Sequence, residues 1–193
     1  EARLPEIEKS VGVLELMAWE GHIRERYYDS FNVIIDMEEE FTKRTKRPPD
    51  NMINALISFG NSLMYATTLG EIYHTQLNPT VSFLHEPGHR RFSLSLDIAE
   101  IFKPVIVDHI IFKLLNMKML GETDFEKDAN YCYLSEKGRK IFLREYDERL
   151  TTTIKHRGLN RNVSYRHLIR LECYRLEKHI SNIDTYKAFR AWW

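Results

Sequence analysis

Three side chains of this sequence have the types that metal-assisted phosphate chemistry requires, although they lie far apart along the chain. Glu20 interrupts an apolar helical stripe, His85 precedes a Pro-Gly turn, and Glu100 stands three residues after Asp97. One imidazole and two carboxylates suit Mg²⁺ or Mn²⁺ better than a structural zinc site, because no thiolate is supplied. Such a site activates water or a hydroxyl and stabilises phosphoryl oxygens during transfer.

Glu20 is unusual because of the residues around it. At about 100° per residue, Leu16, Glu20 and Ile23 share one face of a predicted helix. A buried, unpaired carboxylate is costly, so Glu20 has to be paired, protonated or bound to a metal. The ordinary alternative is a salt bridge to Arg24, four residues further on.

Asp97, Glu100 and His85 have ordinary interpretations too. On a helix the two acids share one face, and Pro104 and Asp108 continue that row. Carboxylates at a helix start also favour the positive end of the helix dipole. A single histidine is usually structural, so the residues alone leave both interpretations open.

The segment 85–89 reads His-Glu-Pro-Gly-His and matches the zinc-protease pattern H-E-x-x-H letter for letter. That motif works only on a helix, where both histidines face one side. Proline removes a helical donor, and glycine adds about 1 kcal/mol of helix penalty. The sequence therefore predicts a loop or strand ending in a turn, and no zinc-protease site.

The composition is that of a soluble globular protein, with 43% hydrophobic and 29% charged residues among 193. No signal peptide and no apolar run long enough to cross a membrane is recognisable. The chain starts at Glu1 and not at methionine, which suggests a fragment. Cys132 and Cys173 are isolated and suggest a reducing compartment without a disulfide framework.

The net charge of zero hides a split between the two halves. Residues 1–100 carry 10 basic and 16 acidic side chains, whereas residues 101–193 carry 18 and 12. Such a split suits a polyanion held at one end and acted on at the other, or simply reflects solvated helix faces. Arg157, Arg161, Arg166 and Arg170 are the candidates for contacts to a DNA backbone.

The apolar spacing predicts a mainly α architecture with short strand pieces. Helices are expected over about 11–37, 51–77, 93–116, 135–153 and 164–181, with Ser10, Ser135 and Ser164 as N-caps. Residues 131–134 are expected to form a short strand approached by the polar segment 124–130, and residues 81–84 are β-prone. The basic, glycine-containing segment 155–163 is expected to be mobile.

Six segments, in order, resemble a known family. They are Leu16–Gly21 (LMAWEG), Asn54–Tyr65 (NALISFGNSLMY), Phe83–Gly88 (FLHEPG), Ser93–Pro104 (SLSLDIAEIFKP), Leu134–Arg139 (LSEKGR) and Val163–Arg166 (VSYR). Together they are similar to the C-terminal helical catalytic domain of the CRISPR-associated integrase–endonuclease that inserts spacers into CRISPR arrays. The resemblance runs from about Val13 to Trp193.

The resemblance implies a specific metal site. The family's ligands map onto Glu20, His85 and Glu100, with Asp97 as an assisting acid. Some members have aspartate where this chain has Glu100, which leaves the direct third ligand open between Glu100 and Asp97. Asn54 matches a recurrent asparagine of the family helix and is expected to support the site.

The resemblance also implies a setting: a prokaryotic, cytoplasmic protein that acts on DNA, forms a homodimer when intact and works with a smaller CRISPR-associated adaptation protein. The family's N-terminal β-rich domain is expected to be absent here or represented only by residues 1–10, so residues 1–10 are expected to be a linker remnant and 11–193 the helical catalytic domain. We therefore expect a metal-dependent DNA endonuclease and integrase using Mn²⁺ or Mg²⁺. The alternative is a non-catalytic helical DNA-binding or scaffold domain whose carboxylates serve as caps and ion pairs.

Overall fold

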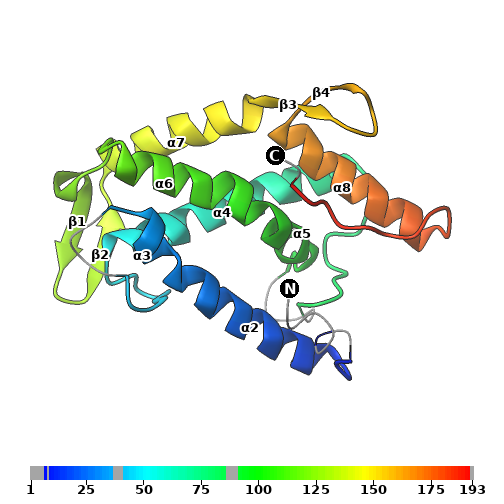
Figure 1. Cartoon of the computed structure of the whole chain (residues 1–193), viewed down its shortest axis with the longest axis horizontal. Coiled ribbons are helices and arrows are strands. Elements are labelled where there is room, and N and C mark those ends of the chain that lie inside the picture. The colour runs from blue at the N-terminus through cyan, green and yellow to red at the C-terminus, as the bar shows by residue number, and fades with distance from the viewer. Residues whose placement is uncertain (1–6, 8, 37–40, 86–90, 192–193) are drawn as a thin grey trace.

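The protein is mainly α-helical, as the sequence predicts, with two small hairpins (Figure 1). The computed structural model describes residues 7, 9–36, 41–85 and 91–191. The body consists of α4 (Met52–Ile72), α5 (Leu94–Lys103), α6 (His109–Asn116), α7 (Glu136–Thr151) and α8 (Tyr165–Ile180). Among the described residues, no helix has the length and apolar character needed to cross a membrane.

Helix α4 runs through the middle of the body and is buried on several sides. It begins where predicted, because the Asn51 side chain accepts a hydrogen bond from the Asn54 backbone N–H at 2.8 Å. Gly60 lets neighbouring side chains approach closely, since a Cβ there would lie 2.5 Å from Val107 and 2.9 Å from Phe142. The helix ends at Ile72, earlier than the predicted 77.

The predicted helix over 93–116 is continuous but not uniform. Between α5 and α6 lies one π-helical segment, η1 (Pro104–Asp108). Proline lacks the N–H that an α-helix would use and its ring crowds the carbonyl four residues earlier, so a widened turn starts there. This turn buries Asp108, which is only 4% exposed.

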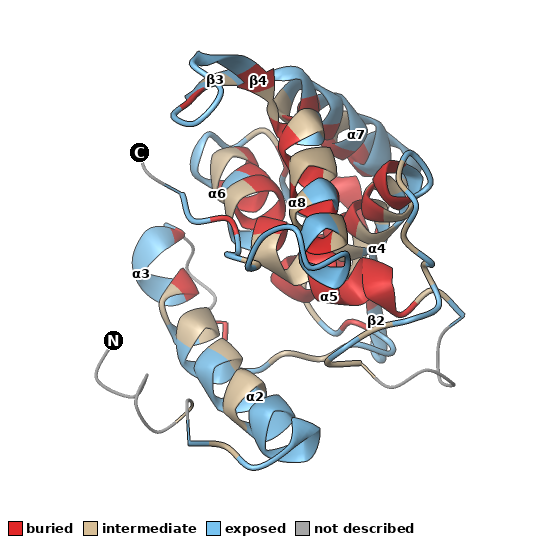
Figure 2. Cartoon of the chain, turned by 90° about the vertical axis from the view of Figure 1, so that its right-hand side faces the viewer, coloured by how far each residue is buried: buried red, intermediate tan, exposed pale blue. Residues whose placement is uncertain are grey.

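The first predicted helix, over 11–37, is partly wrong. Gly12, with φ 105°, and not Ser10, is the N-cap of α2 (Val13–Asp29), and Ser30 separates α2 from α3 (Phe31–Ile34). Position 37 lies outside the described residues. No residue of α2 is buried, and Figure 2 shows the helix standing off the body. The apolar stripe read from the sequence is therefore only partly covered.

The body carries two small hairpins. The expected strand is β2 (Tyr131–Leu134), and its partner β1 (Phe125–Asp128), after the short 3-10 turn η2 (Glu122–Asp124), falls in the segment expected to be its polar approach. The segment 155–163 lies in a hydrogen-bonded hairpin of β3 (Thr153–His156) and β4 (Arg161–Ser164), and its mobility stays a prediction. Residues 81–84, in contrast, form no strand.

Two of the predicted N-caps are confirmed. The Ser135 side chain accepts from the backbone N–H of Gly138 at 3.1 Å and starts α7. The Ser164 side chain accepts from His167 at 3.2 Å and starts α8. Both caps satisfy backbone donors that the first helical turn leaves unpaired.

Candidate metal centre

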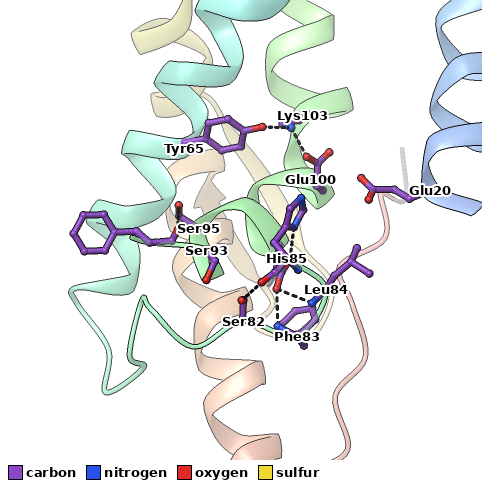
Figure 3. A network of polar contacts seen from close by, with 12 residues as sticks. Glu20, Tyr65, Ser82, Phe83, Leu84, His85, Ser93, Ser95, Glu100 and Lys103 are labelled. Carbon is purple, nitrogen blue, oxygen red and sulfur yellow. Dashed lines mark hydrogen bonds and ion pairs between the residues drawn. The ribbon is translucent and has the colours of Figure 1, made fainter. Parts of the chain in front are cut away.

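The carboxylates of Glu20 and Glu100 both contact the guanidinium of Arg24, although 80 positions separate the two glutamates in the sequence. The Nη2 atom of Arg24 lies 2.5 Å from Oε2 of Glu100 and also contacts Oε1 of Glu20. Both carboxylates thus reach the same nitrogen, Glu20 from α2 and Glu100 from α5. Figure 3 shows the side chains of Glu20 and Glu100 pointing toward one another. Burial lowers the pKa of Arg24, but Glu100 and Glu20 outweigh it and raise the pKa above its ordinary value.

His85 is held by Asp97. The imidazole Nδ1 lies 2.6 Å from Oδ1 of Asp97, whose side chain is fully buried. The same carboxylate accepts backbone N–H bonds from Phe83 at 2.8 Å, Leu84 at 3.2 Å and His85 at 3.1 Å. Asp97 therefore fixes the whole segment 83–85 against the start of α5. With Nδ1 occupied, Nε2 is the ring nitrogen available to a ligand.

Glu100 has a second cationic partner that the sequence argument did not single out. Lys103 Nζ contacts Oε1 of Glu100 and donates to the Tyr65 hydroxyl at 2.7 Å (Figure 3). Lys103 is only 7% exposed, and its ammonium also lies 4.6 Å from the centre of the Tyr65 ring. The signal was its position three residues after Glu100, which places both on one helix face.

A groove of about 610 Å³ lies among the carboxylates and their cationic partners, although His85 is not one of its lining residues. Glu20, Arg24, Asp97, Glu100 and Lys103 line it, together with the apolar side chains of α2 that the fold leaves partly open. The lining of the groove thus combines carboxylates and cationic side chains with apolar side chains of α2. Such a lining suits a ligand with charged groups and flat apolar parts.

Asp108 also lines the groove. Its Oδ2 accepts the Tyr27 hydroxyl at 2.8 Å. Burial raises the pKa of Asp108 to about 6, and the hydrogen bond from Tyr27 opposes that rise. Asp108 appeared in the sequence only as a continuation of the Asp97 and Glu100 row; the π-turn is what directs it inward.

The structure brings the predicted site residues together to different degrees. Glu20 and Glu100 converge, and His85 pairs with Asp97 beside them, but within the described part of the chain no three His, Cys, Asp or Glu side chains are close enough to hold a metal ion. The salt bridge of Glu20 to Arg24, the ordinary alternative, is present as well.

Asn54 lies away from the carboxylates and organises the loop before α4. Fully buried, it donates to Lys43 O at 2.8 Å and Asp50 at 2.7 Å, and accepts from Arg44 at 2.9 Å. Its support of the site stays a prediction. That guanidinium also donates to Ser58 Oγ at 2.9 Å.

The four arginines proposed for DNA belong to the β3–β4 hairpin and to α8, elements that lie apart from α2 (Figures 1 and 2). Arg157 and Arg161 are exposed on the β3–β4 hairpin. Arg170 instead donates to the buried Glu71 at 2.7 Å, and Arg166 lies 4.0 Å from the same carboxylate. The structure therefore does not place this basic surface beside the carboxylates.

Comparison with known proteins decides the family. The model for CRISPR associated protein Cas1 matches residues 1–148. A CRISPR-associated endonuclease Cas1 3 from Thermodesulfovibrio yellowstonii is 61% identical over 181 residues, which are 94% of this chain and 56% of that protein. The chain belongs to the Cas1 family. A Clostridium perfringens Cas1 endonuclease is 57% identical over 93% of the chain and 55% of its own length.

Solved structures agree with this Cas1 assignment. A Cas1 protein from Thermotoga maritima superposes with a TM-score of 0.86 at 43% identity, over 93% of this chain and 56% of that one. A casposase bound to an integration product has a TM-score of 0.85 at 22% identity, which shows a shared fold alone. The chain spans just over half the length of the curated Cas1 relatives it matches.

Proposed function

We propose that the groove between α2 and α5 is the catalytic centre of a metal-dependent DNA endonuclease and integrase that inserts foreign DNA as CRISPR spacers. The convergence of Glu20 and Glu100 on one nitrogen of Arg24 carries this proposal. Two carboxylates that already share a monovalent cation are arranged to share a divalent one. Names of Cas1 relatives, which include endonucleases, support the same assignment.

The residues fit Mn²⁺ or Mg²⁺ by their chemistry, since they offer two carboxylates and one imidazole without a thiolate. Glu20 and Glu100 would supply oxygens, and His85 its Nε2, with Asp97 holding the ring in place. A divalent cation bound there would activate a 3′-hydroxyl or water and offset charge on the phosphate. Arg24 has to move aside for a cation to take the same oxygens.

We also propose the partners. The exposed Arg157 and Arg161 would bind DNA phosphates. Arg166 and Arg170 would bind phosphates more weakly, because the carboxylate of Glu71 neutralises part of their positive charge. The intact protein is proposed to form a homodimer and to assemble with a smaller adaptation protein. Complexes of Cas1 with Cas2 are among the structures that share this fold.

The test separates metal binding from catalysis. Mn²⁺ should raise the thermal unfolding temperature of the wild type, because a ligand that binds only the folded state stabilises it by RT ln(1 + [L]/Kd). Glu20→Gln, His85→Ala and Glu100→Gln should each lose that shift and abolish cleavage and strand transfer of labelled DNA. Glu25→Gln, an exposed acid on the same helix, is the matched control and should keep both.

Two outcomes would count against the proposal. Wild-type cleavage in any of the three variants would remove that residue from the site. Absence of a Mn²⁺-dependent shift in the wild type, with DNA binding intact, would favour the non-catalytic scaffold alternative.

A further inference from the structure

Arg149, near the end of α7, points its guanidinium at the backbone of η1. Its Nε and Nη2 both donate to the carbonyl oxygen of Val105, at 3.0 Å and 2.8 Å. The guanidinium carbon also lies 4.1 Å from the centre of the Tyr165 ring, and Tyr165 is only 2% exposed. Two hydrogen bonds and a cation–π contact therefore fix this side chain in one orientation.

The charge of Arg149 is not explained by an ion pair. Burial lowers the pKa of Arg149, and no carboxylate among the described residues offsets that effect. A partly buried cation is costly when it has no counter-ion. An apolar side chain would serve better if this position of α7 had only to pack, so the reason for the arginine lies in the carbonyl that it binds.

The carbonyl of Val105 lies where the π-turn returns to α-helix. In a regular α-helix the N–H of His109 would donate to Val105 O, four residues earlier. Here that N–H donates to Ile106 O. A π-turn pairs residues five apart, so one carbonyl is passed over when the spacing returns to four. Arg149 supplies hydrogen-bond donors to this carbonyl, as a buried backbone acceptor requires.

The extra residue of the π-turn decides which side chains share a face. Asp108 follows Glu100 by eight positions, which at about 100° per residue would place it about 80° away around the helix. One extra residue in the turn takes back about 100°, which leaves the two side chains about 20° apart. Both of them contact α2, since Glu100 pairs with Arg24 and Asp108 accepts from Tyr27 at 2.8 Å.

The π-turn thus lies between Arg149 and the groove. Its first and last residues, Pro104 and Asp108, both line the groove. Arg149 contacts it from α7, which Figure 1 shows separated from α2 by α4 and α6. On the groove side, the bond from Tyr27 to Asp108 holds the helix that carries Glu20, two turns before Tyr27.

We propose that Arg149 is a positioning residue for the metal centre. It keeps η1 in the π form, which holds Asp108 against Tyr27 and thereby holds α2, with Glu20, at the groove. If η1 relaxed to a regular helical turn, Asp108 would rotate away and α2 would lose that hydrogen bond. The positioning of α2 stands on these contacts alone, whereas its bearing on metal binding rests on the function proposed above.

Amide hydrogen exchange of the 193-residue chain in EDTA tests the positioning of α2 without metal. Arg149→Ala should speed exchange in residues 13–29 roughly tenfold, the scale of one hydrogen bond to a charged group. Tyr27→Phe removes the bond to Asp108 directly and should have the same effect. The double variant should exchange no faster than either single variant, because both substitutions break one linkage.

Arg139→Ala is the matched control. Arg139 also lies on α7 and also donates to a backbone carbonyl, that of Leu134, at 3.0 Å. Its loss should leave exchange in residues 13–29 unchanged. If Arg149→Ala does not fold, Arg149→Lys takes its place, because lysine keeps the charge but cannot form the bidentate contact.

Isothermal titration with Mn²⁺ tests the link to the metal centre. Arg149→Ala should bind Mn²⁺ roughly tenfold more weakly than the wild type, the lower end of the loss when a residue supporting a metal ligand is removed. Arg139→Ala should bind Mn²⁺ like the wild type. A residue that contributed only to global stability would lower the unfolding temperature without changing the Mn²⁺ affinity of the folded protein.

Three results would overturn the proposal. The first is unchanged exchange in residues 13–29 of Arg149→Ala, or an equal rise throughout the chain. The second is a double variant in which the two effects multiply. The third is wild-type Mn²⁺ affinity in Arg149→Ala although α2 exchanges faster. If the wild type itself binds no Mn²⁺, the proposed metal centre fails, and the exchange in EDTA still decides whether Arg149 positions α2.

Discussion

Replacing Asp108 by asparagine should make the protein more stable at neutral pH. Asp108 is buried in η1 with its carboxylate against the Tyr27 hydroxyl, and burial raises its pKa to about 6. Asparagine has nearly the same shape and its side-chain oxygen can still accept the Tyr27 hydrogen bond. The substitution thus removes a charge that the folded state disfavours and keeps the contact.

The sign and size follow from the two protonation equilibria of Asp108. Its folded pKa of about 6 lies above the ordinary 3.8, so between these values the folded state binds more protons than the unfolded state. Stability therefore falls as pH rises through this window and stays lower above it. A shift of about two units corresponds to about 3 kcal/mol at pH 7.

The assay is urea denaturation of wild type and Asp108→Asn in EDTA, from about pH 4 to about pH 8. The two proteins should be equally stable near pH 4, and the variant should gain steadily to about 3 kcal/mol at pH 7. Asp124→Asn is the opposite control. Hydrogen bonding from Lys137 holds the pKa of Asp124 below its usual range. The Asp124→Asn variant should therefore be less stable than the wild type at neutral pH, and this difference in the free energy of unfolding should shrink as pH falls. If the free energy of unfolding changed with pH in the same way for the wild type and Asp108→Asn, the raised pKa of Asp108 in the folded state would be refuted.

Further predictions concern packing and the basic surface. Gly60→Ala should destabilise by about 1–3 kcal/mol in denaturant titration, because its Cβ would collide with Val107, whereas Gly70→Ala, with open space around it, should stabilise by about 0.5–1 kcal/mol. Arg170→Ala should cost about 3 kcal/mol in the same assay by leaving Glu71 buried without its main partner, and Glu71→Gln added to it should recover most of that loss.

The sequence predicts well those elements whose boundaries are set by residues within the element itself. Ser135 and Ser164 cap helices through their own side chains, so their positions mark the starts of α7 and α8. The π-turn was not predictable from periodicity, because Pro104 alone does not say whether a helix bends, breaks or widens. For α2 the spacing shows an apolar stripe, but what the stripe faces depends on tertiary packing.

Some features of the candidate site could be predicted from local sequence patterns, whereas others depend on tertiary packing. Glu20 was detectable because a carboxylate in an apolar stripe needs a partner, and Asp97 with Glu100 because their spacing puts both on one face. The sequence posed the Arg24 salt bridge and a metal site as alternatives. The structure contains the salt bridge, and the same guanidinium also binds Glu100, whereas the metal site stays a prediction. That convergence depends on where α2 lies relative to α5, which no local pattern encodes.

The bridge through Arg24 also explains how α2 is attached. No residue of α2 is buried, and its C-terminal end is secured by Tyr27 and Tyr28 packed against the core. Further along the helix, Arg24, which is also paired with Glu20, forms an ion pair with Glu100 that joins α2 to α5. A divalent cation on the same two carboxylates would replace one cross-link by a stronger one. At the proposed site, metal binding and the docking of α2 would therefore be coupled, and loss of either carboxylate would weaken both.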